Sequence, residues 1–169
     1  QCLTDLMTLT QVKKSFSNLS IAIIGDIKHS RVAHSLIDGL TIMKTPDIRL
    51  IAPEQLLPAY TLPNNVSNFS SLAEGLKNVD AIVCLRIQKE RIDSSEVPDF
   101  DLFYKEFGLN SQAVKYAKKD AIIMHPGPIN RGIEIESAVA DSTQSMILTQ
   151  SHNSVAMRMA IYENMLTSQ

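Results

Sequence analysis

The chain has 169 residues, of which 44% are hydrophobic and 20% charged, and its net charge is -2. This length suits one domain with a single hydrophobic core, and the near-neutral charge excludes nucleic-acid binding driven by bulk electrostatics. No apolar run approaches the roughly 18 residues that span a bilayer, so neither a nucleic acid nor a membrane is expected as a partner.

The predicted elements alternate between helices and strands. The apolar residues Leu3, Leu6, Met7 and Val12 predict an amphipathic helix at the start of the chain. After it, short Ile-rich runs predict strands, and apolar residues three and four positions apart predict helices. In chain order these are strand 20–26, helix 30–43, strand 48–52, a turn at 54–57, a weak strand at 66–69, helix 72–77, strand 81–85, a helical stretch at 111–118, strand 121–124 and helix 154–166. The alternation predicts a single α/β domain, a doubly wound, Rossmann-like parallel sheet flanked by helices.

The two cysteines, Cys2 and Cys84, are too few for a disulfide framework. Cys84 lies within an apolar run, where a small buried side chain is the simplest interpretation. A reducing, cytoplasmic location is the expectation that follows. Because the first residue is Gln1 rather than methionine, we expect the chain to be a piece of a longer protein.

Basic residues follow three of the predicted strands. Arg31 comes after the first strand, Arg86 directly after the fourth, and the segment 125–132, which contains Arg131, after the fifth. Open α/β sheets bind ligands beyond the carboxyl ends of their strands, and the planar fork of arginine suits carboxylates. The pattern therefore indicates a small ligand with more than one negative group. Solvated surface charges or structural ion pairs are the alternative interpretation.

Two other kinds of site have weaker support. Gly25-Asp26 follows a strand, but Ile27 and Ser30 stand where a dinucleotide-binding motif needs glycine. His125 could act as a base or metal ligand, yet the four histidines show no zinc spacing. We therefore expect no cofactor and no metal. The segment 125–128, His-Pro-Gly-Pro, suits presentation of backbone groups to a ligand. The two prolines fix their own φ angles, and the glycine, which has no Cβ, lets a ligand approach the main chain closely.

Five segments resemble motifs of the aspartate transcarbamoylases. They are QCLTDLM at 1–7, GDIKHSRVAHS at 25–35, RIQKER at 86–91, HPGPINRG at 125–132 and SVAMRMAI at 154–161. The resemblance spans nearly the whole chain, in order. It implies the aspartate-binding domain of a transferase in pyrimidine biosynthesis, which joins carbamoyl phosphate and L-aspartate to give N-carbamoyl-L-aspartate and phosphate.

The resemblance implies that Arg31 and Arg86 bind the two carboxylates of L-aspartate and that Gln88 supports the Arg86 loop. Ornithine transcarbamoylase, the sister family, is the alternative. It is expected to have a His-Cys-Leu-Pro type of loop where this chain has 125–128. The cationic ornithine side chain would also be repelled by an arginine at the aspartate-loop position. Aspartate is therefore the expected substrate.

For carbamoyl phosphate, the resemblance implies that Gln1 contacts the carbamoyl group and that the backbone carbonyls of Gly127 and Pro128 accept from its NH2. The family's Ser-x-Arg-Thr phosphate loop does not occur here, and its carbonyl-polarising histidine would fall immediately before Gln1. Preorganised hydrogen-bond donors and charges of this kind typically make the largest single contribution to stabilising a transition state. We therefore expect no catalytic residue in this chain, an inactive isolated chain, and aspartate binding in the millimolar range or weaker.

The implied partners are a missing N-terminal carbamoyl-phosphate domain and, for the full-length protein, a homotrimer. In the family the first and last helices cross to that domain, so their apolar faces are expected to be uncovered here and to favour self-association. The expected apolar faces are Leu3, Leu6 and Met7 in the first helix and Val155, Met159 and Leu166 in the last. A non-catalytic anion-binding or interaction domain is the competing hypothesis, because a fold alone does not fix a function.

Overall fold

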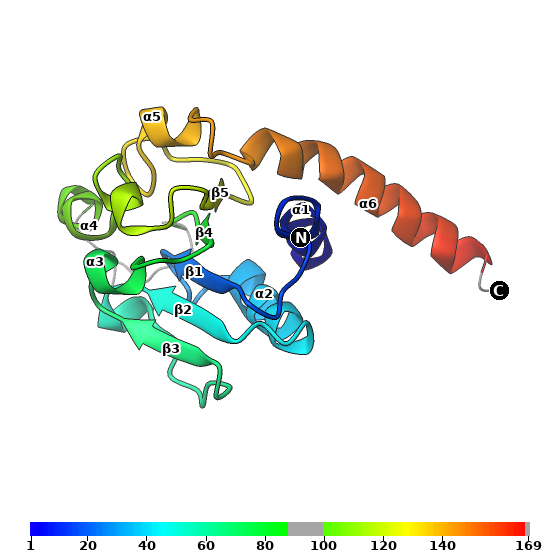
Figure 1. Cartoon of the computed structure of the whole chain (residues 1–169), viewed down its shortest axis with the longest axis horizontal. Helices are drawn as coiled ribbons and strands as arrows, with labels where there is room; N and C mark the ends of the chain where they lie inside the picture. Colours follow the sequence, from blue (N-terminus) through cyan, green and yellow to red (C-terminus); the bar gives the residue numbers. More distant parts are fainter. Residues whose placement is uncertain (88–99, 168–169) are drawn as a thin grey trace.

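A computed structural model describes residues 1–87 and 100–167 of the chain. Its centre is a five-stranded sheet, parallel throughout, in the order β3-β2-β1-β4-β5 (Figure 1). The strands are β1 (Ser20–Ile24), β2 (Asp47–Ile51), β3 (Val66–Phe69), β4 (Ala81–Cys84) and β5 (Ile122–Met124). All five predicted strands and the predicted α/β class are confirmed.

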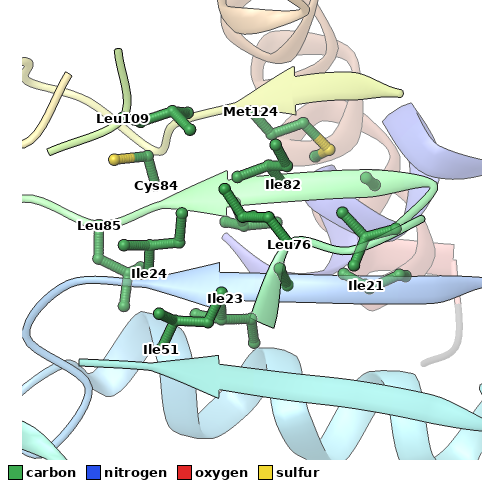
Figure 2. Close-up of a cluster of buried hydrophobic side chains, with 14 of the residues drawn as sticks. Ile21, Ile23, Ile24, Ile51, Leu76, Ile82, Cys84, Leu85, Leu109 and Met124 are labelled. Atoms are coloured by element: carbon green, nitrogen blue, oxygen red, sulfur yellow. The ribbon is translucent and has the colours of Figure 1, made fainter. Parts of the chain in front are cut away.

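The sheet is buried on both faces. Every residue of β4 and all but the first of β1 are buried. Figure 2 shows Ile21 and Ile23 of β1, Ile82 of β4 and Met124 of β5 in one cluster of buried apolar side chains. Parallel strands covered by helices on both sides are apolar on both sides, which explains their continuous rather than alternating apolar runs. The continuous apolar runs are the reason that the strands could be predicted from the sequence.

Helices cover the two faces of the sheet (Figure 1). They are α1 (Cys2–Lys13), α2 (Arg31–Ile42), α3 (Leu72–Gly75), α4 (Phe100–Phe107), α5 (Ser137–Ala140) and α6 (Ile147–Thr167), with 3₁₀ turns at η1 (Glu54–Leu56) and η3 (Ala113–Tyr116). α1 packs against both α2 and α6, and α3 packs against β2, β3 and η3. The described part of the chain thus places α1 between α2 and α6.

Four helical elements differ from the sequence prediction. α4 and α5 were not predicted, although the buried, stacked rings of Phe103 and Phe107 follow helical spacing in α4. The stretch predicted at 111–118 is a short 3₁₀ turn. α6 begins at Ile147 rather than 154, because its first turns bury the polar side chains of Gln150 and Asn153 and so lack the apolar periodicity that predicts a helix.

α1 is a helix as predicted, but its buried face is not the apolar one. The buried residues include Thr4, Asp5 and Thr8, whereas Leu3 is 52% exposed and Val12 is also exposed. The physical reason is that this face meets the polar side chains of α6. Asn153 Nδ2, for example, donates to Thr8 Oγ1 at 2.9 Å. Hydrogen bonding to α6 therefore orients α1 together with the burial of Leu9 in the core.

α6 extends beyond the body of the domain (Figure 1). Large apolar side chains at spacings of seven, four and three residues form one exposed stripe along it, made of Leu148, Val155, Met159, Tyr162 and Leu166. Met159 is 67% and Leu166 74% exposed, which confirms the predicted uncovered face of the last helix. Of the three residues predicted to be uncovered in α1, Leu3 is exposed, whereas Leu6 and Met7 are half-buried. Within residues 1–87 and 100–167, no helix has the length and apolarity to cross a membrane.

The exposed stripe on α6 predicts concentration-dependent self-association, because two copies that meet there remove apolar surface from water. Replacing Val155 and Met159 with lysine should shift the chain towards the monomer. Light scattering over a concentration series measures the change in molar mass. Lysine at the exposed residues Gln55, in η1, and Asn64, in a turn, is the control and should leave the association unchanged. A monomeric wild-type chain at high concentration would contradict the prediction.

Candidate functional site

The carboxyl ends of β1, β4 and β5 lie side by side at one edge of the sheet. The strand order also reverses beside β1: the chain runs outwards from β1 to β2 and β3, then continues on the other side with β4 and β5. Loops diverge at such a switch point, and open α/β sheets bind their ligands there. The three segments singled out in the sequence follow these three strands, so they leave the sheet next to one another.

The loop after β1 starts with a glycine for geometric reasons. Gly25 has a φ of +121°, and a Cβ added to it would lie 2.7 Å from the backbone oxygen of Leu85. The backbone N–H of Leu85 in turn donates to the carbonyl of Ile24 at 2.8 Å. The chain segments that follow β1 and β4 are therefore packed backbone to backbone at the start of the site.

Arg31 is the first residue of α2, as predicted for a residue beside a helix N-terminus. The turn before it is held by the fully buried Asp26, whose Oδ1 accepts from the backbone N–H of His29 at 3.1 Å and lies 2.8 Å from His29 Nδ1. Ser30 then caps α2, its Oγ accepting from the N–H of Ala33 at 3.2 Å. The exposed guanidinium of Arg31 therefore starts from a rigid turn, near the positive end of the helix dipole.

Arg86 lies two residues beyond the end of β4 and is half-buried. Arg31 and Arg86 follow neighbouring strands, which is compatible with one shared anion site. Neither arginine lines the cavity beside β5 that is described next. Gln88, which the sequence placed with Arg86, lies outside the described residues. The aspartate-binding roles of these three residues stay predictions.

A cavity of about 480 Å³ lies beside the end of β5. It is lined by Gln1, by the segment 125–129 and by residues from the first half of α6, and its volume suits a small ligand. Gln1, Gly127 and Pro128 were predicted to contact one ligand, and the structure brings them together on this cavity although they are far apart in sequence. Their contact with carbamoyl phosphate stays a prediction.

His125 is buried beneath the loop that forms one wall of the cavity. Its Nδ1 accepts from the backbone N–H of Gly127 at 2.9 Å, so this nitrogen carries no proton. Its Nε2 therefore carries the proton and donates to Glu134 Oε1 at 3.2 Å. Both ring nitrogens are engaged within the protein, which agrees with the expectation that the segment presents backbone groups rather than side-chain chemistry.

Cys84 is buried next to the same glutamate. Burial raises the pKa of the Cys84 thiol well above its ordinary value of 9.0, and the nearby Glu134 carboxylate raises it further. The thiol donates to the backbone oxygen of Glu134 at 3.2 Å. A protonated, inaccessible thiol is no nucleophile, so the interpretation of Cys84 as a small buried side chain is confirmed. Residues 1–87 and 100–167 hold no cluster of three or more His, Cys, Asp or Glu side chains fit for a metal ion.

Asp5 was not singled out in the sequence, yet it holds two side chains that line the cavity. Its Oδ1 accepts from Gln1 Nε2 at 2.7 Å and from Gln150 Nε2 at 2.9 Å. Burial raises the pKa of this carboxyl, and the two hydrogen bonds offset only part of that effect. A signal was present in the sequence, because Thr4, Asp5 and Thr8 form a polar stripe at helical spacing.

Comparison with known proteins gives consistent matches. The sequence model of the family described as aspartate/ornithine carbamoyltransferase, Asp/Orn binding domain, matches residues 17–165. The aspartate carbamoyltransferase catalytic subunit of Coxiella burnetii is 52% identical over 163 residues, which are 96% of this chain and 52% of that protein. The same subunit of Ruthia magnifica is 48% identical over 163 residues, covering 96% and 51% of the two chains. This chain thus spans about half the length of the curated relatives that it matches.

A solved structure shows the same fold. Aspartate transcarbamoylase from Trypanosoma cruzi, in complex with N-(phosphonacetyl)-L-aspartic acid, superposes with a TM-score of 0.79 at 26% sequence identity. The match covers 95% of this chain and 53% of that one. The half-length coverage therefore recurs in structure as well as in sequence.

The substitution Asp5→Asn tests the effect of the buried carboxyl on stability. Because the pKa of Asp5 is raised in the folded chain, its contribution to stability is fully present below the ordinary pKa of 3.8. The contribution is lost as the pH rises through the raised pKa. Asparagine keeps an accepting oxygen and cannot ionise, so the variant should gain stability relative to wild type as the pH rises. Urea unfolding between about pH 4 and about pH 8 measures the difference.

The control for this experiment is Asp141→Asn. The Arg131 guanidinium beside Asp141 holds the pKa of that exposed carboxyl below its ordinary value, so its contribution is present at neutral pH and lost as the pH falls through the lowered pKa. Above the ordinary pKa of 3.8 this contribution stays constant, so Asp141→Asn should keep the pH dependence of the wild type between about pH 4 and about pH 8. Equal trends for the two variants would contradict the assignment to Asp5.

Proposed function

Because the chain belongs to the aspartate/ornithine carbamoyltransferase family and matches its Asp/Orn binding domain, we propose that residues 1–169 are the L-aspartate-binding domain of an aspartate carbamoyltransferase. The whole enzyme would transfer a carbamoyl group from carbamoyl phosphate to L-aspartate, giving N-carbamoyl-L-aspartate and phosphate for pyrimidine biosynthesis. The observation that carries the proposal is the 52% identity to the aspartate carbamoyltransferase catalytic subunit of Coxiella burnetii over 96% of the chain.

The residues after β1 and β4 support aspartate as the ligand. Arg31 and Arg86 follow adjacent strands, and two arginines can grip two carboxylates through paired hydrogen bonds. Ornithine carries a cationic side chain, which an arginine would repel. The names of the curated relatives favour aspartate over ornithine as well. We assign Gln88 a supporting role beside Arg86, as the family resemblance implies.

The cavity beside β5 supports binding of the carbamoyl group. A carbamoyl NH2 has two N–H donors, so it needs oxygen acceptors. The backbone carbonyls of Gly127 and Pro128 are such acceptors, and both residues line the cavity with Gln1. The Gln1 NH2 is already engaged with Asp5 at 2.7 Å, so its oxygen is the group that can accept from the ligand.

The phosphate and the developing charge of the reaction need several cationic groups, whereas Arg158 is the one arginine or lysine among the described residues that line the cavity, and the family's Ser-x-Arg-Thr loop does not occur in the sequence. We assign these groups to a carbamoyl-phosphate domain, for which the additional length of the relatives leaves room. No residue of the present chain is assigned a catalytic role. The whole protein is proposed to be a cytoplasmic homotrimer, and the two free cysteines suit a reducing compartment.

The isolated chain should form no N-carbamoyl-L-aspartate and should bind L-aspartate in the millimolar range or weaker, because half of the site is missing. Joined to the first half of the Coxiella burnetii catalytic subunit, in place of the matching half, it should restore carbamoyl transfer. A product assay and calorimetry measure the two properties. An active isolated chain, micromolar aspartate affinity, or a folded but inactive chimera would contradict the proposal, and the last result would favour a non-catalytic binding domain.

In the active chimera, Arg31→Lys and Arg86→Lys should each lower kcat/KM for aspartate by about 10-fold to 100-fold, since lysine cannot donate two parallel hydrogen bonds to one carboxylate. The matched control is Arg49→Lys. Arg49 lies in β2, on the opposite side of β1 from β4, and its Nη2 is 2.7 Å from Asp47 Oδ2. Arg49→Lys should lose stability and keep its KM for aspartate. If KM rose as much in Arg49→Lys as in the Arg31 and Arg86 variants, a direct role for Arg31 and Arg86 would be contradicted.

A further inference from the structure

Four hydrogen bonds form a continuous chain from one wall of the cavity to the other, which we call the relay. Gln1 Nε2 donates to Asp5 Oδ1 at 2.7 Å, and Gln150 Nε2 donates to the same oxygen at 2.9 Å. At its other end, Gln150 Oε1 accepts from the backbone N–H of His125 at 2.8 Å. His125 Nδ1 then accepts from the backbone N–H of Gly127 at 2.9 Å.

The middle of the relay is shielded from water, and its ends are not. Asp5 is fully buried, and Gln150 and His125 are 3% and 1% exposed. Gln1 and Gly127, in contrast, are exposed and line the cavity. Hydrogen bonds are stronger in a buried environment, and a partner lost there is not replaced by water. The relay therefore joins two ligand-accessible points through a buried, rigid centre.

The donors and acceptors of the relay can point in only one direction. The backbone N–H of His125 can only donate, so the oxygen of Gln150 faces it and the NH2 of Gln150 faces Asp5. Because Asp5 Oδ1 accepts from both glutamines, Gln1 must also turn its NH2 towards Asp5. The oxygen of Gln1 is consequently turned away from Asp5 and is available as an acceptor.

We propose that Asp5 and Gln150 are positioning residues, which hold the Gln1 amide and the Gly127-Pro128 backbone in a fixed arrangement around the carbamoyl NH2. This inference rests on the proposed function, because it takes the ligand of the cavity to be carbamoyl phosphate. Oxygen acceptors from Gln1 and from the Gly127-Pro128 loop, which are far apart in sequence, must lie close enough to receive the two N–H groups of one carbamoyl NH2. The relay links these two parts through side chains of α1 and α6.

The decisive substitution is Gln150→Glu in the active chimera. It replaces the NH2 that donates to Asp5 with an oxygen, so that two carboxyl oxygens face each other in a buried site. KM for carbamoyl phosphate should rise, and kcat/KM should fall by about 10-fold to 100-fold, as expected for a small displacement of binding groups. Gln150→Met removes both hydrogen bonds without adding charge and should act in the same direction, which covers the case that the charged variant does not fold.

Two further variants separate positioning from general stability. Asp5→Leu removes the oxygen that accepts from both glutamines, so KM for carbamoyl phosphate should rise as in the Gln150 variants. Asn153→Asp makes the same amide-to-carboxyl change one turn further along α6. It breaks the bond from Asn153 Nδ2 to Thr8 Oγ1 in the same helix–helix interface but outside the relay. This control should lower the urea midpoint and leave KM for carbamoyl phosphate unchanged.

An independent measurement uses the 169-residue chain without any activity assay. Amide hydrogen exchange at Gly127 should be faster in Gln150→Met than in wild type and unchanged in Asn153→Asp. The inference is overturned if folded Gln150 variants keep KM within about two-fold and leave this exchange unchanged, or if Asn153→Asp has the same effects as they do. An inactive wild-type chimera would contradict the proposed function, while the exchange at Gly127 still decides whether the relay holds the loop.

Discussion

Parallel pairing of β1 with β2 on one side and β4 on the other is the constraint on which the site depends. Parallel strands end at one edge, so every loop that follows a strand is delivered there. The close contact of Gly25 with the backbone of Leu85 shows how tightly the loops after β1 and β4 are joined. Arg31, Arg86 and the segment 125–129 each follow one of three neighbouring strands, so this pairing brings them to the same edge of the sheet.

The interface between α1 and α6 adds a second constraint, which is polar. A buried carboxyl is unfavourable unless its hydrogen bonds are satisfied, and Asp5 meets this condition only in part, since its Oδ2 has no hydrogen-bond partner among the described residues. The raised pKa of Asp5 has the same physical origin. The matched donors and acceptors also specify the position of α1 relative to α6. An apolar contact would specify that position less closely.

The two parts of the site differ in chemistry. The edge beside β1 and β4 carries two arginines, which are able to donate to anions, whereas the cavity beside β5 has Arg158 together with Gln1 and the Gly127-Pro128 backbone, whose oxygens are able to accept from N–H groups. A dicarboxylate and a carbamoyl group are the ligands that this division suits in the proposed function. Neighbouring strands β4 and β5 bring the two chemistries to one edge, while the cations for a phosphate are assigned to another domain.

The sequence by itself determined the strands, the α/β class, and the residues at the strand ends, because apolar runs and the side chains that follow them are local properties. It did not reveal α4, the early start of α6 or the buried face of α1. The cavity also came only from the tertiary structure, since Gln1 and Gly127 meet through Asp5, Gln150 and His125. Those hydrogen bonds join residues distant in the chain. The polar stripe of Thr4, Asp5 and Thr8 is visible in the sequence, but a polar stripe on a helix is as typical of a solvent-exposed face as of a buried one, so its partners are decided only by the tertiary structure.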